Sequence, residues 1–441
     1  MPETSRAFRS SGSAVHALVI LMLATFTALL DRYLIGLLLD PIRADFGISD
    51  TQASLLQGFA FAIFYSVLGL PFGRLVDRGN RRNIIIFGIV IWSLTTIACG
   101  FAQSYTSLFF ARLGVGFGEA CLAPAAYSLI TDLFPPKRHA RALAWYTAAS
   151  IVGGGGSFII GAEALHFAKR LATEHAGFTG TEPWRLTFMI VGAPGLAVAL
   201  LMLSFREPAR QALGAQSDLP SWRELGAFMF RIRWPLFAII GAGSAMTIAG
   251  SGVVGWLAVF LMRTYHVPVT TGGQWIGLIL IGSAILGGTL SGWLGDSKRI
   301  GSMQGQKFNV ILIGSAAAAL LVVAFPLMPS AVLALSVYAL QAIAYNVAAC
   351  AAPTVLQDIL PNRFKGQVGA FYWLCVGLIG FGGGSTIVAL VTDRVLGDEL
   401  ALRYSLAIVG SIAMIAACLC VILGRRTYQR LRDEISVAGG A

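Results

Sequence analysis

Two opposite charges, Arg112 and Glu119, lie seven residues apart inside a long apolar stretch. On an α-helix this spacing places both side chains on one face, roughly 10 Å apart along the axis. Because Gly114, Gly116 and Gly118 have no side chains, another backbone, water or a ligand can approach closely between the charges. Inside a bilayer each charge costs on the order of 2.5–3.5 kcal/mol or more at the centre. A partner charge, a water-filled cavity or a function must offset that cost.

The composition indicates that this stretch is surrounded by lipid. The 441 residues are 56% hydrophobic and only 12% charged, with a mean hydropathy of +0.74. A soluble domain averages about 25% charged residues, so half that share favours a membrane protein. About twelve apolar runs are long enough to cross the hydrocarbon core, and strand-type alternation with aromatic girdles is absent. The sequence therefore predicts an all-α polytopic membrane protein with twelve transmembrane helices.

The basic residues predict the orientation of these helices. With an even number of spans, 23 of the 32 Lys and Arg residues fall on the side of the two termini and 7 on the other side. Such an excess marks the cytoplasmic side, so both termini are expected there. The net charge of +11 thus reflects topology, and no nucleic-acid partner is expected.

The second half of the chain repeats features of the first. Gly292 to Asp296 echoes Gly73 to Asp77, and the turn that begins at Asp358 echoes the turn that begins at Asp132. Two parallel halves are typical of secondary transporters. The predicted division is a tail at 1–13, a six-helix bundle at 14–206, a cytoplasmic linker with a surface helix at 207–234, a second six-helix bundle at 235–424 and a tail at 425–441.

These motifs resemble those of the major facilitator superfamily. The loop motif between the family's second and third spans matches Gly73, Asp77, Arg78, Arg81 and Arg82, and its weaker copy includes Asp296. Arg112 to Glu119 resembles the fourth-span motif that is tied to proton coupling. The run Gly153, Gly154, Gly155 and Gly156 resembles the antiporter motif but lacks its proline, so we interpret it as a helix-packing surface.

A narrower resemblance is to bacterial members of the Spinster branch. It rests on Asp31-Arg32-Tyr33 in the first span, on Ser49-Asp50 before the second span and on Gly118-Glu119 in the fourth. The resemblance implies an amphiphilic substrate of the sphingoid phosphate or lysophospholipid class. It also implies location in the bacterial inner membrane as a multi-pass plasma membrane protein.

The facilitator resemblance implies that the first and fourth spans line a central cavity. Asp31 would then face Arg112 and Glu119, with Arg32 nearer the end of its span. Moving Arg112 between the two acids as the halves rock would change which acid holds a proton, so we assign proton coupling to these three residues. The alternative is a static ion pair that only fixes helix packing.

Further roles follow for the other motifs. Gly73, Asp77, Arg78, Arg81, Arg82 and Asp296 are interpreted as a conformational latch. Arg112 and Glu119 are also candidate substrate contacts, together with Tyr345 and Asn346 in the tenth span. For the last two, the alternative is a hydrogen bond between helices.

The sequence lacks the motifs of membrane enzymes and of ATP-driven pumps. The sequence has no His-Glu-x-x-His, no serine with a histidine at membrane depth and no ATP-binding Gly-x-x-x-x-Gly-Lys-[Ser/Thr]. We therefore expect no enzyme activity, no cofactor and no metal. The expected partners are the bilayer, protons and a small amphiphile, with the protein as a monomer. The alternative function is a proton-coupled carrier of a small organic anion or sugar acid, with Arg112 as the anion contact.

Overall fold

The computed structural model describes residues 11–210, 221–297 and 306–439, in which every regular element is helical. Twelve helical stretches of the described residues are long and apolar enough to cross a membrane. The predicted all-α, twelve-span fold is confirmed. The spans are Gly12–Phe46, Asp50–Gly69, Arg81–Gly100, Tyr105–Leu133, Pro136–Glu174, Pro183–Met202, Arg233–Tyr265, Val269–Asp296, Gln306–Leu327, Ala331–Ile359, Arg363–Leu396 and Glu399–Leu431.

The chain separates into two compact units. Unit 1 takes its described residues from Met1–Ile35 and Ile63–Gly214, and unit 2 takes them from Gly36–Ala62 and Ala215–Ala441. The ends of the first two spans, residues 36–62, thus group with the second half of the chain. The predicted division into 14–206 and 235–424 stays a prediction, as do the two tails, of which 1–10 and 440–441 lie outside the described residues.

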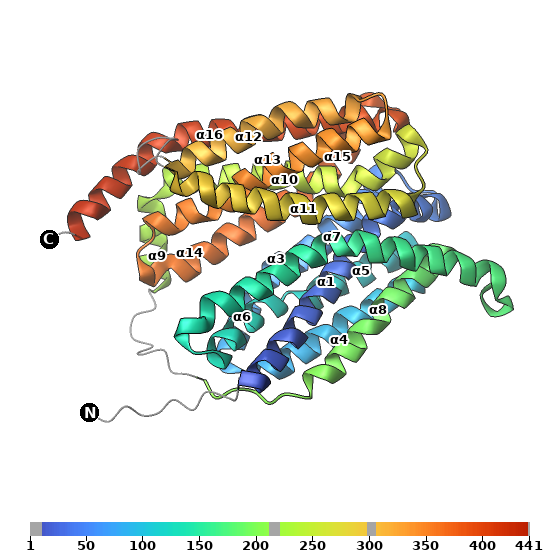
Figure 1. The fold of residues 1–441 in the computed structure, drawn as a ribbon, viewed down its shortest axis with the longest axis horizontal. Coiled ribbons are helices and arrows are strands. Elements are labelled where there is room, and N and C mark those ends of the chain that lie inside the picture. The colour runs from blue at the N-terminus through green and yellow to red at the C-terminus, as the bar shows by residue number, and fades with distance from the viewer. Residues whose placement is uncertain (1–10, 211–220, 298–305, 440–441) are drawn as a thin grey trace. The chain divides into compact units, whose positions relative to one another are not determined.

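Unit 1 is built around α4, which packs along α8 and α5 (Figure 1). Small residues allow this approach: a Cβ atom on Gly192 of α8 would lie 3.0 Å from the backbone oxygen of Ser93 in α4. Close backbone packing of this kind holds helices together where lipid removes the hydrophobic driving force. The elements of unit 1 are α1 (Ser11–Phe46) up to Ile35, α3 (Phe59–Arg78) from Ile63, α4 (Arg81–Gly100), α5 (Tyr105–Glu119), α6 (Leu122–Leu133), α7 (Pro136–Glu174), η1 (Ala176–Phe178) and α8 (Pro183–Met202).

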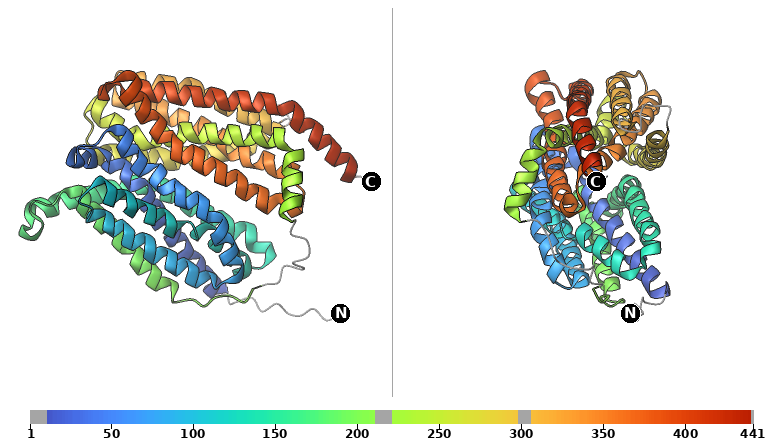
Figure 2. Two further views of the ribbon diagram at one scale, coloured as in Figure 1. Left: turned by 180° about the vertical axis from the view of Figure 1, so that it is seen from behind. Right: turned by 90° about the vertical axis from the view of Figure 1, so that its left-hand side faces the viewer.

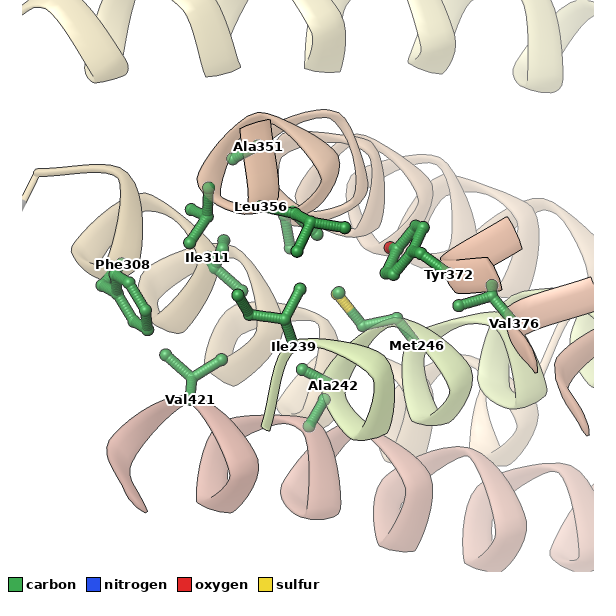
Figure 3. Close-up of a cluster of buried hydrophobic side chains, with 14 of the residues drawn as sticks. Ile239, Ala242, Met246, Phe308, Ile311, Ala351, Leu356, Tyr372, Val376 and Val421 are labelled. Carbon is green, nitrogen blue, oxygen red and sulfur yellow. The ribbon is translucent and has the colours of Figure 1, made fainter. Parts of the chain in front are cut away.

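Unit 2 is built around α10, which packs along α16, α15 and α13. Figure 3 shows part of its core, where Met246 of α10 lies among side chains of the neighbouring helices, including Leu356 and Tyr372. The elements of unit 2 are α2 (Asp50–Gln57), α9 (Trp222–Arg231), α10 (Arg233–Tyr265), α11 (Val269–Asp296), α12 (Gln306–Ala324), η3 (Phe325–Leu327), α13 (Ala331–Ile359), α14 (Asn362–Cys375), η4 (Val376–Phe381), α15 (Gly382–Leu390), η5 (Val391–Leu396), η6 (Glu399–Ala401) and α16 (Leu402–Gly439).

A short helix, α9, lies within the segment predicted to be a linker with a surface helix; residues 211–220 of that segment lie outside the described residues. Figure 2 shows α9 turned across the ends of α10 and α14. Its first turn is closed by a capping box between Ser221 and Glu224. The hydrogen bonds from Ser221 hold the pKa of the Glu224 carboxyl below its usual range. Phe228 stacks on Phe364 of α14, with ring centroids 4.1 Å apart, so α9 is docked onto unit 2.

Candidate functional site

Two of the three glycines between Arg112 and Glu119 let α5 lie directly against α4. A Cβ atom on Gly118 would stand 2.7 Å from the carbonyl oxygen of Gly88, and one on Gly114 would stand 2.5 Å from the Thr95 side chain. The sequence leaves room here for another backbone, water or a ligand, and at Gly118 the structure places the backbone of α4 there. This contact fixes the rotation of α5 and hence the direction in which both charges point.

Adding one methyl group at Gly118 is expected to separate α4 from α5. The cost of such overpacking is about 1–3 kcal/mol, and Gly118→Ala should lower the apparent melting temperature of the purified protein by several degrees. Gly69→Ala in α3 is the matched control, since a Cβ atom there meets nothing within 4 Å. Equal melting temperatures for the two variants would show that the contact does not hold unit 1 together.

The fourth span breaks immediately after Glu119. Helix α5 ends at this residue and α6 begins at Leu122. The Cys121 thiol donates to the carbonyl oxygen of Gly118 at 3.3 Å, so one of the carbonyl groups freed by the break is satisfied. A carboxylate at the C-terminal end of a helix is unfavourable because the helix dipole is negative there. Glu119 therefore needs a cation close by.

Arg32 supplies that cation. Its Nη2 lies 2.5 Å and its Nε 3.1 Å from Oε2 of Glu119, and its guanidinium stands 4.5 Å from the ring centre of Tyr65. The sequence favours Arg112 as the partner of the two acids, with Arg32 nearer the end of its span, whereas the structure pairs Glu119 with Arg32. The one feature of the sequence that points to Arg32 is its position next to Asp31.

Arg112 and Asp31 complete the group. Nη1 of Arg112 donates to the backbone carbonyl of Asp31 at 3.2 Å, and Asp31 interacts electrostatically with both Glu119 and Arg112. Asp31, Arg112 and Glu119 are 2%, 0% and 1% exposed. Oδ1 of Asp31 and Oε1 of Glu119 have no hydrogen-bond partner among the described residues. With both acids ionised the four charges of this cluster, which we call the buried charge cluster, sum to zero.

A second buried arginine, Arg81, connects α4, the end of α6 and the segment after α8 in unit 1. Its guanidinium forms ion pairs with Asp132 at the end of α6 and with Glu207 after α8, and it is 1% exposed. Glu207 also accepts from the backbone N–H of Arg82 at 2.9 Å, at the N-terminus of α4. Nη1 of Arg82 donates to the carbonyl of Phe205 at 2.8 Å. The predicted latch residues Arg81 and Arg82 thus bind elements within unit 1, and their partner Glu207 is not evident from the sequence.

The other predicted latch residues are more exposed than Arg81. Asp77 and Arg78 at the end of α3 are exposed and Gly73 is half-buried. Asp296 ends α11 in unit 2 and is exposed. The latch function of this set stays a prediction.

The predicted contacts in the tenth span lie in unit 2, on α13. The amide of Asn346 donates to the carbonyl of Ala342 in its own helix at 2.8 Å. The Tyr345 ring fills the space over Gly250 of α10, where a Cβ atom would lie 2.6 Å from it. The Asn346 bond lies within one helix and Tyr345 packs between two helices, and both the substrate role and the alternative of a hydrogen bond between helices stay predictions.

The glycine run of the fifth span faces the first span. Cβ atoms on Gly153 and Gly156 would stand 3.3 Å and 3.1 Å from Phe26 of α1, while Gly154 lies beside Tyr33 and Gly155 is buried. Helix α7 therefore packs on α1 near the buried charge cluster.

Comparison with known proteins agrees with this architecture. A family model described as the Major Facilitator Superfamily matches residues 21–385. The chain belongs to the major facilitator superfamily. Its twelve spans form the two pseudo-symmetric six-helix halves of the major facilitator fold, and the protein is a polytopic membrane protein.

Relatives with known names include members of the Spinster branch. The chain is 31% identical over 274 residues to an MFS-type efflux pump of Mycolicibacterium smegmatis, covering 60% of this chain and 58% of that one. It is 32% identical over 267 residues to human protein spinster homolog 1, covering 58% of this chain and 47% of that one. The chain thus spans about half the length of the curated relatives it matches.

Solved structures match over nearly the whole chain. A crystal structure of a bacterial homologue of the human lysosomal transporter Spinster, in an inward-facing and unoccupied conformation, aligns with a TM-score of 0.77 and 28% identity. It covers 96% of this chain and 98% of that one. A D-xylose–proton symporter, at 16% identity and a TM-score of 0.68, covers 92% and 97% and shares the fold. The predicted resemblance to bacterial Spinster-like transporters is confirmed.

Proposed function

We propose that this facilitator is a proton-coupled secondary transporter of an amphiphilic lipid, of the sphingoid phosphate or lysophospholipid class, which works by alternating access. The observation that carries the proposal is the buried charge cluster, in which Arg32 pairs with Glu119 at 2.5 Å inside the spans. Intramembrane ionisable residues are expensive and mark ion or proton pathways by default.

The charge balance of the cluster suggests how a proton acts. A proton on Glu119 removes the negative charge that holds Arg32 and leaves an excess positive charge among Asp31, Arg32 and Arg112. An uncompensated buried charge is strongly unfavourable, so Arg32 must then find another anion. Asp31 and a phosphate group of the substrate are the two candidates. Proton binding would in this way be linked to binding or release of the substrate.

The exposure of the two arginines favours Arg32 as the substrate contact. Its side chain is 17% exposed, whereas Arg112 is fully buried. Arg112, proposed from the sequence as a contact for the substrate or for a small anion, would instead hold the backbone of Asp31 and set its position. The choice of the lipid class comes from the resemblance to the Spinster branch, to which human protein spinster homolog 1 belongs by name.

The orientation and location belong to the same proposal. We propose that the protein lies in the bacterial inner membrane, with both termini cytoplasmic as the basic residues indicate. It would act as a monomer, without enzyme activity or a cofactor. The role of conformational latch for Gly73, Asp77, Arg78, Arg81, Arg82 and Asp296 belongs to the same proposal.

The test is transport by the purified protein in liposomes with an imposed pH gradient. Labelled lysophospholipid, labelled sphingoid phosphate and a panel of small organic acids are offered to wild type and Asp31→Asn. We expect gradient-driven lipid flux in wild type and flux that no longer responds to the gradient in the variant. Flux of an organic acid alone would replace the lipid by the small anion, and unchanged coupling in Asp31→Asn would remove Asp31 from the mechanism.

A further inference from the structure

The ends of the first two spans are built into unit 2 although the rest of these spans belongs to unit 1. Helix α2 packs on α15, and the end of α1 lies beside α10 at Gly36 and Gly255. Residues 36–62, which include the end of the first span and the beginning of the second, thus connect the first half of the chain to helices of the second half. Their contacts form two layers, one charged and one of small residues.

The charged layer centres on Arg263 in the last turn of α10. Its guanidinium binds Asp40 of α1 at 2.6 Å, and it binds both carboxylate oxygens of Asp50 at 2.6 and 2.8 Å. The Asp50 side chain is fully buried and that of Arg263 is 7% exposed. Bidentate arginine–carboxylate pairs that are shielded from water are among the strongest polar contacts in proteins.

Two further contacts extend this layer towards the last two spans. Arg43 of α1 forms an ion pair with Glu399 of η6, where Nη2 lies 2.5 Å from Oε2. The backbone N–H and hydroxyl of Thr51 donate to Asp393 of η5 at 2.7 and 2.6 Å. Residues 36–62 are therefore tied to three separate segments of the second half.

The layer of small residues is formed around Gln57 and Gly58 at the end of α2. The Gln57 side chain lies between Gly36 and Gly255 and donates to the Gly255 carbonyl at 3.2 Å. At Gly58, where the second span breaks between α2 and α3, a Cβ atom would stand 2.8 Å from the carbonyl oxygen of Gly382. No other residue type fits at Gly58 without moving one backbone away from the other.

We propose that these two layers are an outer clamp, which keeps the transporter closed on the side opposite the termini and must open once in each transport cycle. The outer clamp consists of Asp40, Arg43, Asp50, Thr51, Gln57 and Gly58 on the first half and Gly255, Arg263, Gly382, Asp393 and Glu399 on the second. The inference rests on the proposed orientation and on alternating access, because opening that side requires the ends of the first two spans to leave the second half.

The two layers oppose opening for different reasons. Separating Arg263 from Asp40 and Asp50 leaves buried charges unpaired until water reaches them. Separating the glycines gives up close backbone contact but exposes no charge. Breaking either layer should shift the equilibrium towards the open side, with a larger shift for the charged layer.

The test measures access to the clamp without measuring transport. Ser54 of α2 is completely buried, so Ser54→Cys reports opening through its reaction with a membrane-impermeant maleimide added outside intact cells. The rate is compared in three backgrounds: unchanged, Arg263→Gln and Gly58→Ala. The chain without Ser54→Cys gives the background from the six native cysteines.

Matched controls lie in the same unit. Arg403→Gln removes an arginine that binds the carbonyls of Pro326 and Met328, and Gly282→Ala adds a methyl group where nothing lies within 4 Å. We expect labelling to rise by about tenfold or more with Arg263→Gln, as for a shift of about 1.4 kcal/mol, and by less with Gly58→Ala. The two controls should leave the rate unchanged.

Equal labelling rates in all backgrounds, or the same increase in the controls, would overturn the clamp. If Arg263→Gln does not accumulate in the membrane, the comparison of the labelling rate in Gly58→Ala with that in Gly282→Ala tests the clamp by itself. Labelling only from the cytoplasmic side would contradict the proposed orientation instead. Because maleimide access needs no substrate, failure of the clamp is distinguishable from failure of the proposed lipid transport.

Discussion

Replacing Arg32 with alanine is expected to lower gradient-driven uptake by about 100-fold or more and to destabilise the protein. The variant leaves Glu119 buried without its cation, at a cost of roughly 3–5 kcal/mol, where each 1.4 kcal/mol corresponds to a factor of ten. Glu119 can escape this cost by remaining protonated, and then it no longer exchanges protons with the bulk. Uptake in liposomes and the apparent melting temperature measure the two effects.

The double variant Arg32→Ala/Glu119→Gln separates stability from coupling. With both charges removed, the melting temperature should return close to that of wild type, while uptake should stay low because no proton can be exchanged at Glu119. Arg32→Lys keeps the charge but loses the bidentate geometry, and we expect intermediate uptake. Full uptake in the double variant would show that the Arg32–Glu119 pair only holds helices together.

The number and type of the spans could be predicted because these helices are surrounded by lipid. A span needs about 20 apolar residues whatever its neighbours are, so composition and run length were enough for twelve helices. The glycines at 114 and 118 likewise predicted a close approach, which α4 makes through its backbone at Gly118 and through the Thr95 side chain at Gly114. Such features are local: they depend on residue types within a few turns of one helix.

The partners of the buried charges could not be predicted in the same way. Arg32 and Arg112 both interact with Glu119, and which of them forms the ion pair depends on the rotation of α1 and α5. That rotation is set by the contact of Gly118 with Gly88 and by the break after Glu119. Neither feature has a sequence signal that shows which residue, 87 positions away in the chain, will pair with Glu119.

The partner of Arg81 was missed for a similar reason. Glu207 lies 126 residues further along the chain, in a segment that reads as the start of a polar linker. Only the packing of α4 along α8 brings that segment to the N-terminus of α4. The arginines of the loop motif are therefore evident from the sequence, but the acids that bind Arg81 are not.

Replacing Arg81 with alanine is expected to lower the free energy of unfolding by about 3–5 kcal/mol, the usual cost of breaking a buried ion pair. Asp132 and Glu207 would both lose their cation, with side chains that are only 10% and 20% exposed. The hydrogen bonds of Arg81 to Ser128 and to the carbonyl of Pro208 would be lost as well. The apparent melting temperature in detergent measures the effect.

Arg78→Ala is the control for Arg81→Ala, because Arg78 belongs to the same loop motif but is exposed. It should change the melting temperature little, since exposed ion pairs contribute about 0–1 kcal/mol. In the Arg81→Ala background, Asp132→Asn with Glu207→Gln removes the two unpaired charges and should recover part of the lost stability. A large loss with Arg78→Ala and none with Arg81→Ala would mean that the motif acts through its exposed face, as a latch, and does not hold unit 1 together.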